Sequence, residues 1–280
     1  LGDKELENYL QKLCGYILCG ERYEQIIIFI VGSGANGKSV FLNVLSKLFG
    51  DYAGFINSSS VIYGNNSTIP NDIAGLYGKR LVSLSEFPER SLLNTTLLKS
   101  MSGGDNVLAR KLYQDWFEFN PEFQLICAMN EIPEIKEDDE AFLRRLKVIE
   151  FNANFKEDKI DKNLTKKLYS EIEGIMNWAI KGYKLYQKHG LKDIDHIRSA
   201  LNKFIDLSNP LNEFFKSNIK VTHNDKDVIS VQDMHDYSNN FSKKYYDKFI
   251  EKSTLCKFFK KKNFPIKQKR FYYNRVNCFI

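Results

Sequence analysis

Eight consecutive residues of this chain have the types and spacing of a phosphate-binding loop. They read G-x-x-x-x-G-K-S and are Gly32, Ser33, Gly34, Ala35, Asn36, Gly37, Lys38 and Ser39. An apolar run, 26–31, predicts a strand before the loop, and an amphipathic segment, 40–49, predicts a helix after it. Glycines let backbone N–H groups turn toward an anion, and the helix N-terminus adds free N–H groups of its own. The motif therefore predicts that the chain binds a nucleoside triphosphate, with Lys38 on the phosphates and Ser39 on Mg²⁺.

Two polar residues end later apolar stretches and fit the same site. Glu86 ends the stretch 81–86, where a carboxylate can help to place Mg²⁺ and polarise the attacking water. The residue before it is Ser85, where many such motors have a second acid, so Glu86 would act with Ser39 and water. Asn130 follows a third predicted strand, and its amide can bridge the γ-phosphate and the water. Taken singly, each residue is also compatible with a solvated strand end or a turn.

Arg144 and Arg145 follow an acidic stretch, 137–140. A guanidinium that reaches the γ-phosphate of a neighbouring subunit would stabilise the charge of the transition state. The alternative is ion pairing with the preceding acids, which we expect for one of the two arginines.

Several segments together occur in the order of a known family. They are 32–39, 81–86, 99–105 (K-S-M-S-G-G-D), 108–113 (L-A-R-K-L-Y), 119–121 (F-N-P), 130–133 (N-E-I-P), 142–145 (F-L-R-R) and 149–151 (I-E-F). On these motifs the chain resembles the superfamily 3 helicase core of phage, plasmid and large-DNA-virus primase–helicases, a variety of AAA+ ATPase. The resemblance is detailed over residues 5–155, and its most specific part is 99–113.

The resemblance implies a ring, usually a hexamer, that binds ATP and Mg²⁺ between subunits and acts on single-stranded DNA. It implies Lys38 and Ser39 as the phosphate and Mg²⁺ groups, Glu86 as the catalytic acid and Asn130 as the sensor. It also implies that Arg144 or Arg145 acts in trans as an arginine finger.

The same resemblance implies that the block after residues 103–105 forms a hairpin lining a central channel. Arg110 and Lys111 are then the candidates for holding DNA phosphates, with Tyr113 nearby. Cations on such a hairpin can hold a phosphate backbone without reading bases. The alternative is that these charges only keep the hairpin soluble.

Strands that alternate with helices predict an α/β fold with a three-layer, largely parallel sheet. The resemblance implies that this sheet is of the AAA+ type with its phosphate-binding loop. We expect four parts. Residues 1–22 form an N-terminal helical segment, part of the AAA+ collar, and 23–155 form the ATPase core. Residues 156–208 form a helical segment that packs on the core, and 209–280 form a basic winged-helix-like domain. The last part contains three predicted helices and three short strands, over 211–217, 231–249, 253–263, 264–267, 270–274 and 278–280. Elsewhere the patterns predict a mobile loop over 57–71, a hairpin over 107–119 and one helix over 162–187.

Charge is distributed unevenly along the chain. Residues 212–280 contain 15 Lys and Arg against 7 Asp and Glu, whereas the preceding residues contain 26 and 28. The basic end indicates a polyanionic partner, and we expect duplex DNA there in addition to single-stranded DNA in the ring. A solvated basic face without a partner and a protein-binding winged helix remain open alternatives.

The five cysteines are scattered and never spaced C-x-x-C. This spacing argues against a metal site and a disulfide framework, so we expect buried thiols in a reducing compartment, the cytoplasm of a bacterium or of a virus-infected cell. No apolar run approaches the ~20 residues of a membrane span, and we expect no membrane partner. The chain begins at Leu1 without a methionine, so we expect a piece of a longer protein. The resemblance to primase–helicases implies an upstream primase domain or a separate primase as a further partner.

These features predict an ATP-dependent replicative DNA helicase. One alternative is a nucleotide-switched origin-binding or replication-loading factor that does not itself translocate. Another is a small-molecule or nucleoside kinase, although the sequence contains no evident lid for an acceptor substrate.

Overall fold

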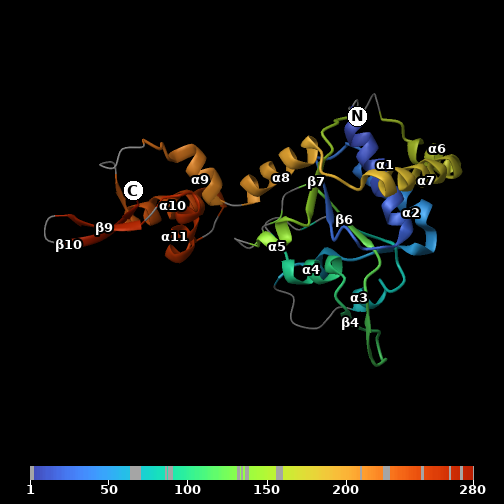
Figure 1. Ribbon diagram of the computed structural model, residues 1–280, viewed down its shortest axis with the longest axis horizontal. Coiled ribbons are helices and arrows are strands. Elements are labelled where there is room, and N and C mark those ends of the chain that lie inside the picture. The colour runs from blue at the N-terminus through green and yellow to red at the C-terminus, as the bar shows by residue number, and fades with distance from the viewer. Residues whose placement is uncertain are drawn as a thin grey trace. The chain divides into compact units, whose positions relative to one another are not determined.

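A computed structural model describes residues 3–63, 71–85, 87, 91–130, 133, 135, 139–155, 160–208, 210–222, 228–246, 249–264, 266–271 and 274–279. The chain divides into two compact units, Leu1–Phe204 and Ile205–Ile280 (Figure 1).

The first unit is built on a five-stranded parallel sheet with the strand order β2-β3-β6-β1-β7. The strands are β1 (Ile27–Val31), β2 (Ala53–Phe55), β3 (Leu81–Ser85), β6 (Gln124–Met129) and β7 (Leu146–Glu150). The central strand β1 pairs with β6 and β7, so that Ile27 lies opposite both Leu125 and Leu146. It is a continuous apolar run because both of its faces are buried, as expected of an interior parallel strand.

Helices cover both faces of this sheet. On one face, Ile28 and Ile30 of β1 pack against α1 (Lys4–Cys19), α2 (Lys38–Phe49) and α7 (Ile172–His189). On the other face, Ile27 and Phe29 pack against α3 (Asn71–Ala74), α4 (Thr95–Gly103), α5 (Glu140–Leu143) and α8 (Asp195–Ser208). The predicted α/β fold with a central parallel sheet is thereby confirmed.

The predicted hairpin is also confirmed. Strands β4 (Val107–Arg110) and β5 (Trp116–Phe119) pair antiparallel, with Val107 opposite Phe119 and Arg110 opposite Trp116. Alternation along β4 buries Val107 and Ala109 and exposes Leu108 and Arg110. The hairpin projects from the first unit (Figure 1), which leaves its tip free of the sheet.

Two expectations in the first unit were wrong, and two short elements were not predicted. The single helix over 162–187 is two helices, α6 (Leu164–Ser170) and α7, which meet at Glu171. The Ser170 hydroxyl donates to the Lys167 carbonyl at 2.6 Å, and a hydroxyl that bonds back to the helix backbone favours such a break. Part of the expected mobile loop, 57–63, is ordered: it contains a short 3₁₀ helix (Ser58–Val61) whose Val61 is fully buried. A second 3₁₀ helix (Gly50–Tyr52) and the short edge strand β2 were not predicted.

The second unit has its own core and a small antiparallel sheet of order β8-β10-β9. Its elements are α9 (Pro210–Asn218), β8 (Ile229–Ser230), α10 (Val231–Tyr246), α11 (Lys252–Lys261), β9 (Ile266–Phe271) and β10 (Asn274–Phe279). The core joins the helices through Leu211, Phe214, Met234, Leu255 and Phe259.

The three helices expected there are present, but the strands differ from expectation. Two six-residue strands replace the three short ones, and the expected strand over 270–274 spans the point where β9 ends and β10 begins. The two-residue strand β8 was not predicted, because it is too short to show a period of two.

Candidate functional site

The phosphate-binding loop joins β1 to α2 at the carboxyl edge of the sheet, where ligands of open α/β sheets bind. Gly34 and Gly37 have φ angles of 98° and 91°, a backbone conformation that residues with a Cβ rarely adopt. At Gly32 the reason for glycine is space: a Cβ there would lie 2.5 Å from the Phe151 carbonyl oxygen. Three of the loop's positions thus need glycine for conformation or for close approach.

Asn36 holds the loop from within. Its amide nitrogen donates to the Phe151 carbonyl at 3.0 Å, so the loop is tied to the segment that follows β7. The same side chain accepts from the Lys38 ammonium at 3.2 Å. Asn36 is buried. Nothing in the sequence indicates that this side chain positions Lys38, because the motif allows any residue at this place.

Lys38 lies in the first turn of α2, and its ammonium points back into the loop. It donates to the Gly32 carbonyl at 2.6 Å and to the Asn130 amide oxygen at 2.9 Å, in addition to Asn36. The residue is only 6% exposed, and this burial lowers the pKa of the ammonium below its ordinary value. The structure therefore brings together Lys38 and Asn130, which lie 92 positions apart in sequence.

The N-terminus of α2 carries no side-chain cap, because Gly37 occupies the capping position. Its first N–H groups are consequently available to an anion. Ser39 is exposed in this turn. Glu86, the expected catalytic acid and second Mg²⁺ ligand, lies outside the described residues, but β3 ends beside β6 at the same edge of the sheet. Donor chemistry and backbone geometry here fit a triphosphate with Mg²⁺.

The two arginines lie at the opposite edge. Both directly precede β7, whose first residue Leu146 pairs with Ile27 at the start of β1. The length of a five-residue strand, about 15 Å, separates this edge from the loop. Arg144 is exposed, and its guanidinium has no hydrogen-bond or ion-pair partner among the described residues. Neither arginine is therefore positioned to serve the loop of its own chain.

Arg145 has a different environment from Arg144. It is half-buried, and its guanidinium donates to the Ala141 carbonyl at 2.6 Å. The neighbouring acid Asp139 pairs instead with Lys99 at 2.8 Å. Although partial burial raises the pKa of Asp139, hydrogen bonds from Lys99 and its neighbours hold it below its ordinary value overall. The Arg145 guanidinium thus bonds its own chain, whereas that of Arg144 is exposed and has no partner in the part of the chain that the structure describes.

The hairpin presents the expected DNA-contacting residues at its tip. Lys111 is exposed, and Tyr113 is 93% exposed in a left-handed backbone conformation with φ of 61°. Arg110 donates to the Gln114 carbonyl at 2.9 Å and lies over the Trp116 ring at 5.6 Å. Trp116 is half-exposed and was missed in the sequence, although the hairpin register places it directly opposite Arg110.

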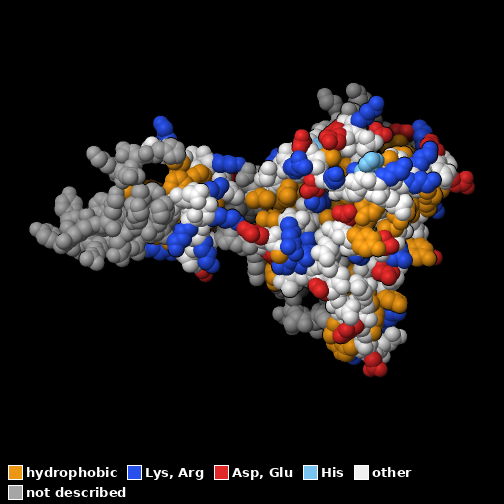
Figure 2. Space-filling model, viewed as in Figure 1, with side chains coloured by type: hydrophobic (Ala, Val, Ile, Leu, Met, Phe, Trp, Pro, Cys, Tyr) orange, Lys and Arg blue, Asp and Glu red, His pale blue; other side chains and the backbone are white. Residues whose placement is uncertain are grey.

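Apolar side chains gather over the projecting hairpin, with acidic side chains among them (Figure 2). Leu112 and Leu108 are exposed in addition to Tyr113 and Trp116. A surface that combines cations with exposed aromatic rings suits a strand of nucleic acid, whose bases stack and whose phosphates carry charge.

Other chemistry is limited in the described part of the chain. Those residues contain no group of three or more His, Cys, Asp or Glu side chains suited to a metal ion. None of their helices combines the length and apolar character needed to cross a membrane. Cys14 and Cys127 are fully buried free thiols, while Cys19 and Cys256 are partly accessible.

Comparisons with known proteins agree with these observations. Residues 30–145 match a family of unknown function (DUF5906). "Putative helicase V13" of Sputnik virophage is 30% identical over 254 residues, which cover 76% of this chain and 32% of that protein. "Putative helicase L207/L206" of Acanthamoeba polyphaga mimivirus is 29% identical over 263 residues, which cover 87% of this chain and 27% of that protein. The chain thus spans about a third or less of the length of these relatives.

The fold is shared with a solved structure described as "The A form apo structure of NrS-1 C terminal region-CTR". The TM-score is 0.60 at 16% identity, over 99% of this chain and 71% of the other. The chain is thus similar over most of its length to viral proteins named putative helicases, in agreement with the resemblance to the superfamily 3 helicase core.

Proposed function

We propose that this chain is the ATPase motor of a replicative DNA helicase, which couples ATP hydrolysis at subunit interfaces to movement on single-stranded DNA and to duplex unwinding. One observation carries the proposal: the Lys38 and Asn130 side chains meet at one edge of the sheet, while Arg144 is exposed at the other. The names of the viral relatives support the same reading.

In the proposed site, the loop residues bind and orient the triphosphate. The Lys38 ammonium exchanges its bonds to Gly32, Asn36 and Asn130 for phosphate oxygens, and the N–H groups of the first turn of α2 add to them. The Ser39 hydroxyl would hold Mg²⁺, and the ion would neutralise part of the phosphate charge. Glu86 takes the proton of the attacking water, and the released Asn130 amide orients that water.

Arg144 is proposed to act in trans. A ring of head-to-tail subunits brings the amino edge of one sheet to the carboxyl edge of the next, which is the contact that a trans guanidinium needs. A guanidinium supplied in this way stabilises the charge that develops on the γ-phosphate. This arrangement needs self-association, and a hexamer is the proposed ring.

The hairpin is proposed to hold the translocated strand. Arg110 and Lys111 contact phosphates, and Tyr113 and Trp116 offer faces for bases to stack on. Because such contacts do not read base edges, the motor would act on any sequence.

Mixing two inactive variants tests the shared active site. Lys38→Ala and Arg144→Ala should each abolish most ATP hydrolysis, because each removes one half of every interface. In a randomly mixed ring, about one interface in four receives Lys38 from one subunit and Arg144 from the next. Mixing the two variants should therefore restore measurable ATPase activity.

The controls decide between interpretations. Arg145→Ala should lower thermal stability more than it lowers turnover, because its guanidinium bonds the Ala141 carbonyl of its own chain. Failure of the mixture to regain activity, although both variants fold and associate, would contradict the trans assignment. Wild-type ATPase activity without strand displacement would instead favour the loading-factor alternative.

A further inference from the structure

The most strongly charged helix of the second unit has no role in the proposed motor. Helix α11 and the residue after it contain five lysines and no acid between positions 252 and 262, namely Lys252, Lys257, Lys260, Lys261 and Lys262. All five are exposed. Figure 2 shows basic side chains gathered over this part of the second unit.

Helix α11 is amphipathic, and its apolar side packs into the core of the second unit. Leu255 and Phe259 are buried in the unit's core with Leu211 and Met234. The lysines are the charged residues on the remaining sides of α11, so the helix presents a basic face to solvent.

The lysines are not equivalent. Lys252 donates to Gln232 at 2.9 Å, and Lys262 lies over the rings of Phe215 and Phe258 at 5.4 and 5.6 Å. Lys257 and Lys260 have no partner among the described residues, and their spacing of three places them on one side of the helix. These two ammonium groups are therefore free to bind an anion.

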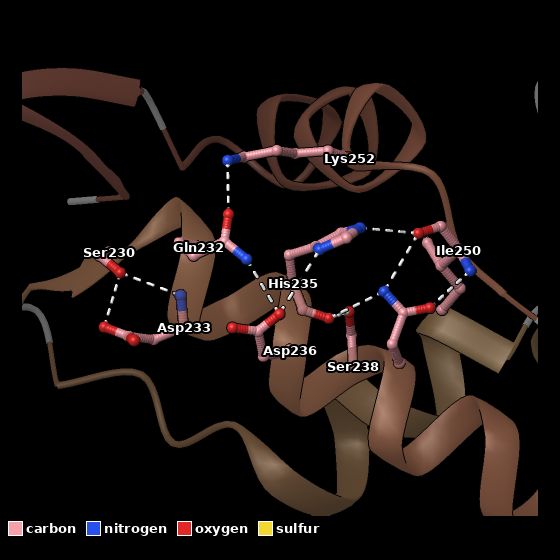
Figure 3. Close-up of polar contacts among 9 residues, drawn as sticks. Ser230, Gln232, Asp233, His235, Asp236, Ser238, Ile250 and Lys252 are labelled. Atoms are coloured by element: carbon pink, nitrogen blue, oxygen red, sulfur yellow. Dashed lines mark hydrogen bonds and ion pairs between the residues drawn. The ribbon is translucent and has the colours of Figure 1, made fainter.

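Polar contacts fix the position of α11 relative to α10 (Figure 3). Just before α11 begins, the Ile250 backbone donates to the Asn239 amide oxygen at 2.7 Å and accepts from its nitrogen at 3.1 Å. The His235 Nε2 lies 2.9 Å from the same Ile250 carbonyl. At the start of α10, Ser230 and Asp233 exchange bonds of 2.6 and 2.9 Å. Ile250, two residues before α11, is thus held by two side chains of α10.

From these observations we infer that α11 is a docking helix for duplex DNA, with Lys257 and Lys260 on phosphates. The order of elements supports the choice of a duplex, because α9, α10, α11 and then the β9–β10 hairpin follow the plan of a winged helix. A rigid basic helix suits the major groove of B-form DNA, about 12 Å wide, whereas the major groove of an RNA duplex is deep and narrow.

This inference adds a second nucleic-acid surface to the proposed motor and can fail independently of it. The test is fluorescence anisotropy of the full chain with a labelled blunt 20-base-pair DNA duplex, a single strand of equal length and an RNA duplex, across a salt series. The variant is Lys257→Gln/Lys260→Gln. A matched control is Lys181→Gln/Lys184→Gln, two exposed lysines with the same spacing on α7.

Loss of two phosphate contacts should reduce the slope of log K against log salt by about 1.8 and weaken duplex binding by about tenfold to a hundredfold at moderate salt. The control should bind as the wild type does, and both variants should keep the thermal midpoint and the ATPase rate of the wild type. Unchanged duplex affinity in the α11 variant, equal loss in the control, or equal binding of the RNA duplex would overturn the inference. Absent ATPase activity would count against the motor only.

Discussion

At the residue scale, the candidate site is defined by what a single lysine contacts. The Lys38 ammonium bonds three oxygens, from Gly32, Asn36 and Asn130. Two of these partners belong to the loop itself, but Asn130 comes from another strand. The contact connects the phosphate-binding loop to the end of β6, so a ligand that withdraws Lys38 also frees the Asn130 amide.

The hairpin charges give a prediction at the same scale. Replacing Arg110 and Lys111 by glutamine should leave basal ATP hydrolysis nearly unchanged and remove most of its stimulation by single-stranded DNA. Both residues are exposed, and the hairpin that carries them projects away from the sheet and its phosphate-binding loop (Figure 1). ATPase rates with and without DNA measure this. The Lys181→Gln/Lys184→Gln variant is the control, and full stimulation of the hairpin variant would contradict the assignment to DNA.

At the scale of elements, the first unit depends on a close helix pair. A Cβ on Gly182 of α7 would lie 1.9 Å from the Gln11 carbonyl oxygen, and one on Gly15 of α1 would lie 2.0 Å from the Tyr183 backbone nitrogen. Two glycines therefore let the backbones of α1 and α7 touch. This pair forms the layer over the β1 face that also carries α2, and so it supports the helix that follows the phosphate-binding loop.

Gly182→Ala should destabilise the first unit by about 1–3 kcal/mol, because the added methyl group must displace backbone and not a flexible side chain. Gly174→Ala in the same helix should be neutral or stabilising by up to about 1 kcal/mol, since nothing lies within 4 Å of its Cβ position. Urea unfolding monitored by circular dichroism compares the two. Equal effects of the two alanines would show that the close approach is not needed.

At the scale of the whole molecule, the two units differ in charge as well as in core. The first carries the sheet and the candidate site, and the second carries the lysine-rich α11. Their separate hydrophobic clusters mean that each unit can carry its own surface for nucleic acid. A protein with two such surfaces would show two salt-dependent binding modes, one for single strands and one for duplexes.

Buried acidic groups give a prediction for global stability. Burial raises the pKa of the Cys14 thiol to about 12 and also raises those of Cys127 and Tyr9. Above pH ~8.5 the thiols ionise in the unfolded chain but stay protonated in the folded one. The free energy of unfolding is therefore highest below that pH, and it falls as pH rises toward the pKa values of the folded state. In this pH window each thiol should lower the free energy of unfolding by about 1.4 kcal/mol per pH unit.

Urea unfolding at pH 8, 9 and 10 measures this slope. The double variant Cys14→Ala/Cys127→Ala should have a lower stability at pH 8, because it loses packed volume, but a shallower decline with pH. A decline as steep as that of the wild type would assign the alkaline sensitivity to other groups.

The sequence by itself determined the candidate loop, the strand and helix that flank it, and the hairpin. Each is a local pattern: glycines at fixed offsets before a lysine, a continuous apolar run, and alternation on either side of a turn. Sequence also predicted the alternation of strands and helices that defines the α/β core. These features follow from the backbone and from nearest neighbours, which a linear pattern records.

Only the tertiary structure decided how these parts meet. It placed Asn130 on Lys38, separated Arg144 from Arg145 by environment, and set both arginines at the edge opposite the loop. It also brought Gly15 and Gly182 into contact and broke the helix expected over 162–187. The physical reason is that strand order and helix packing join segments far apart in sequence, and a side chain's burial and partners depend on those joins.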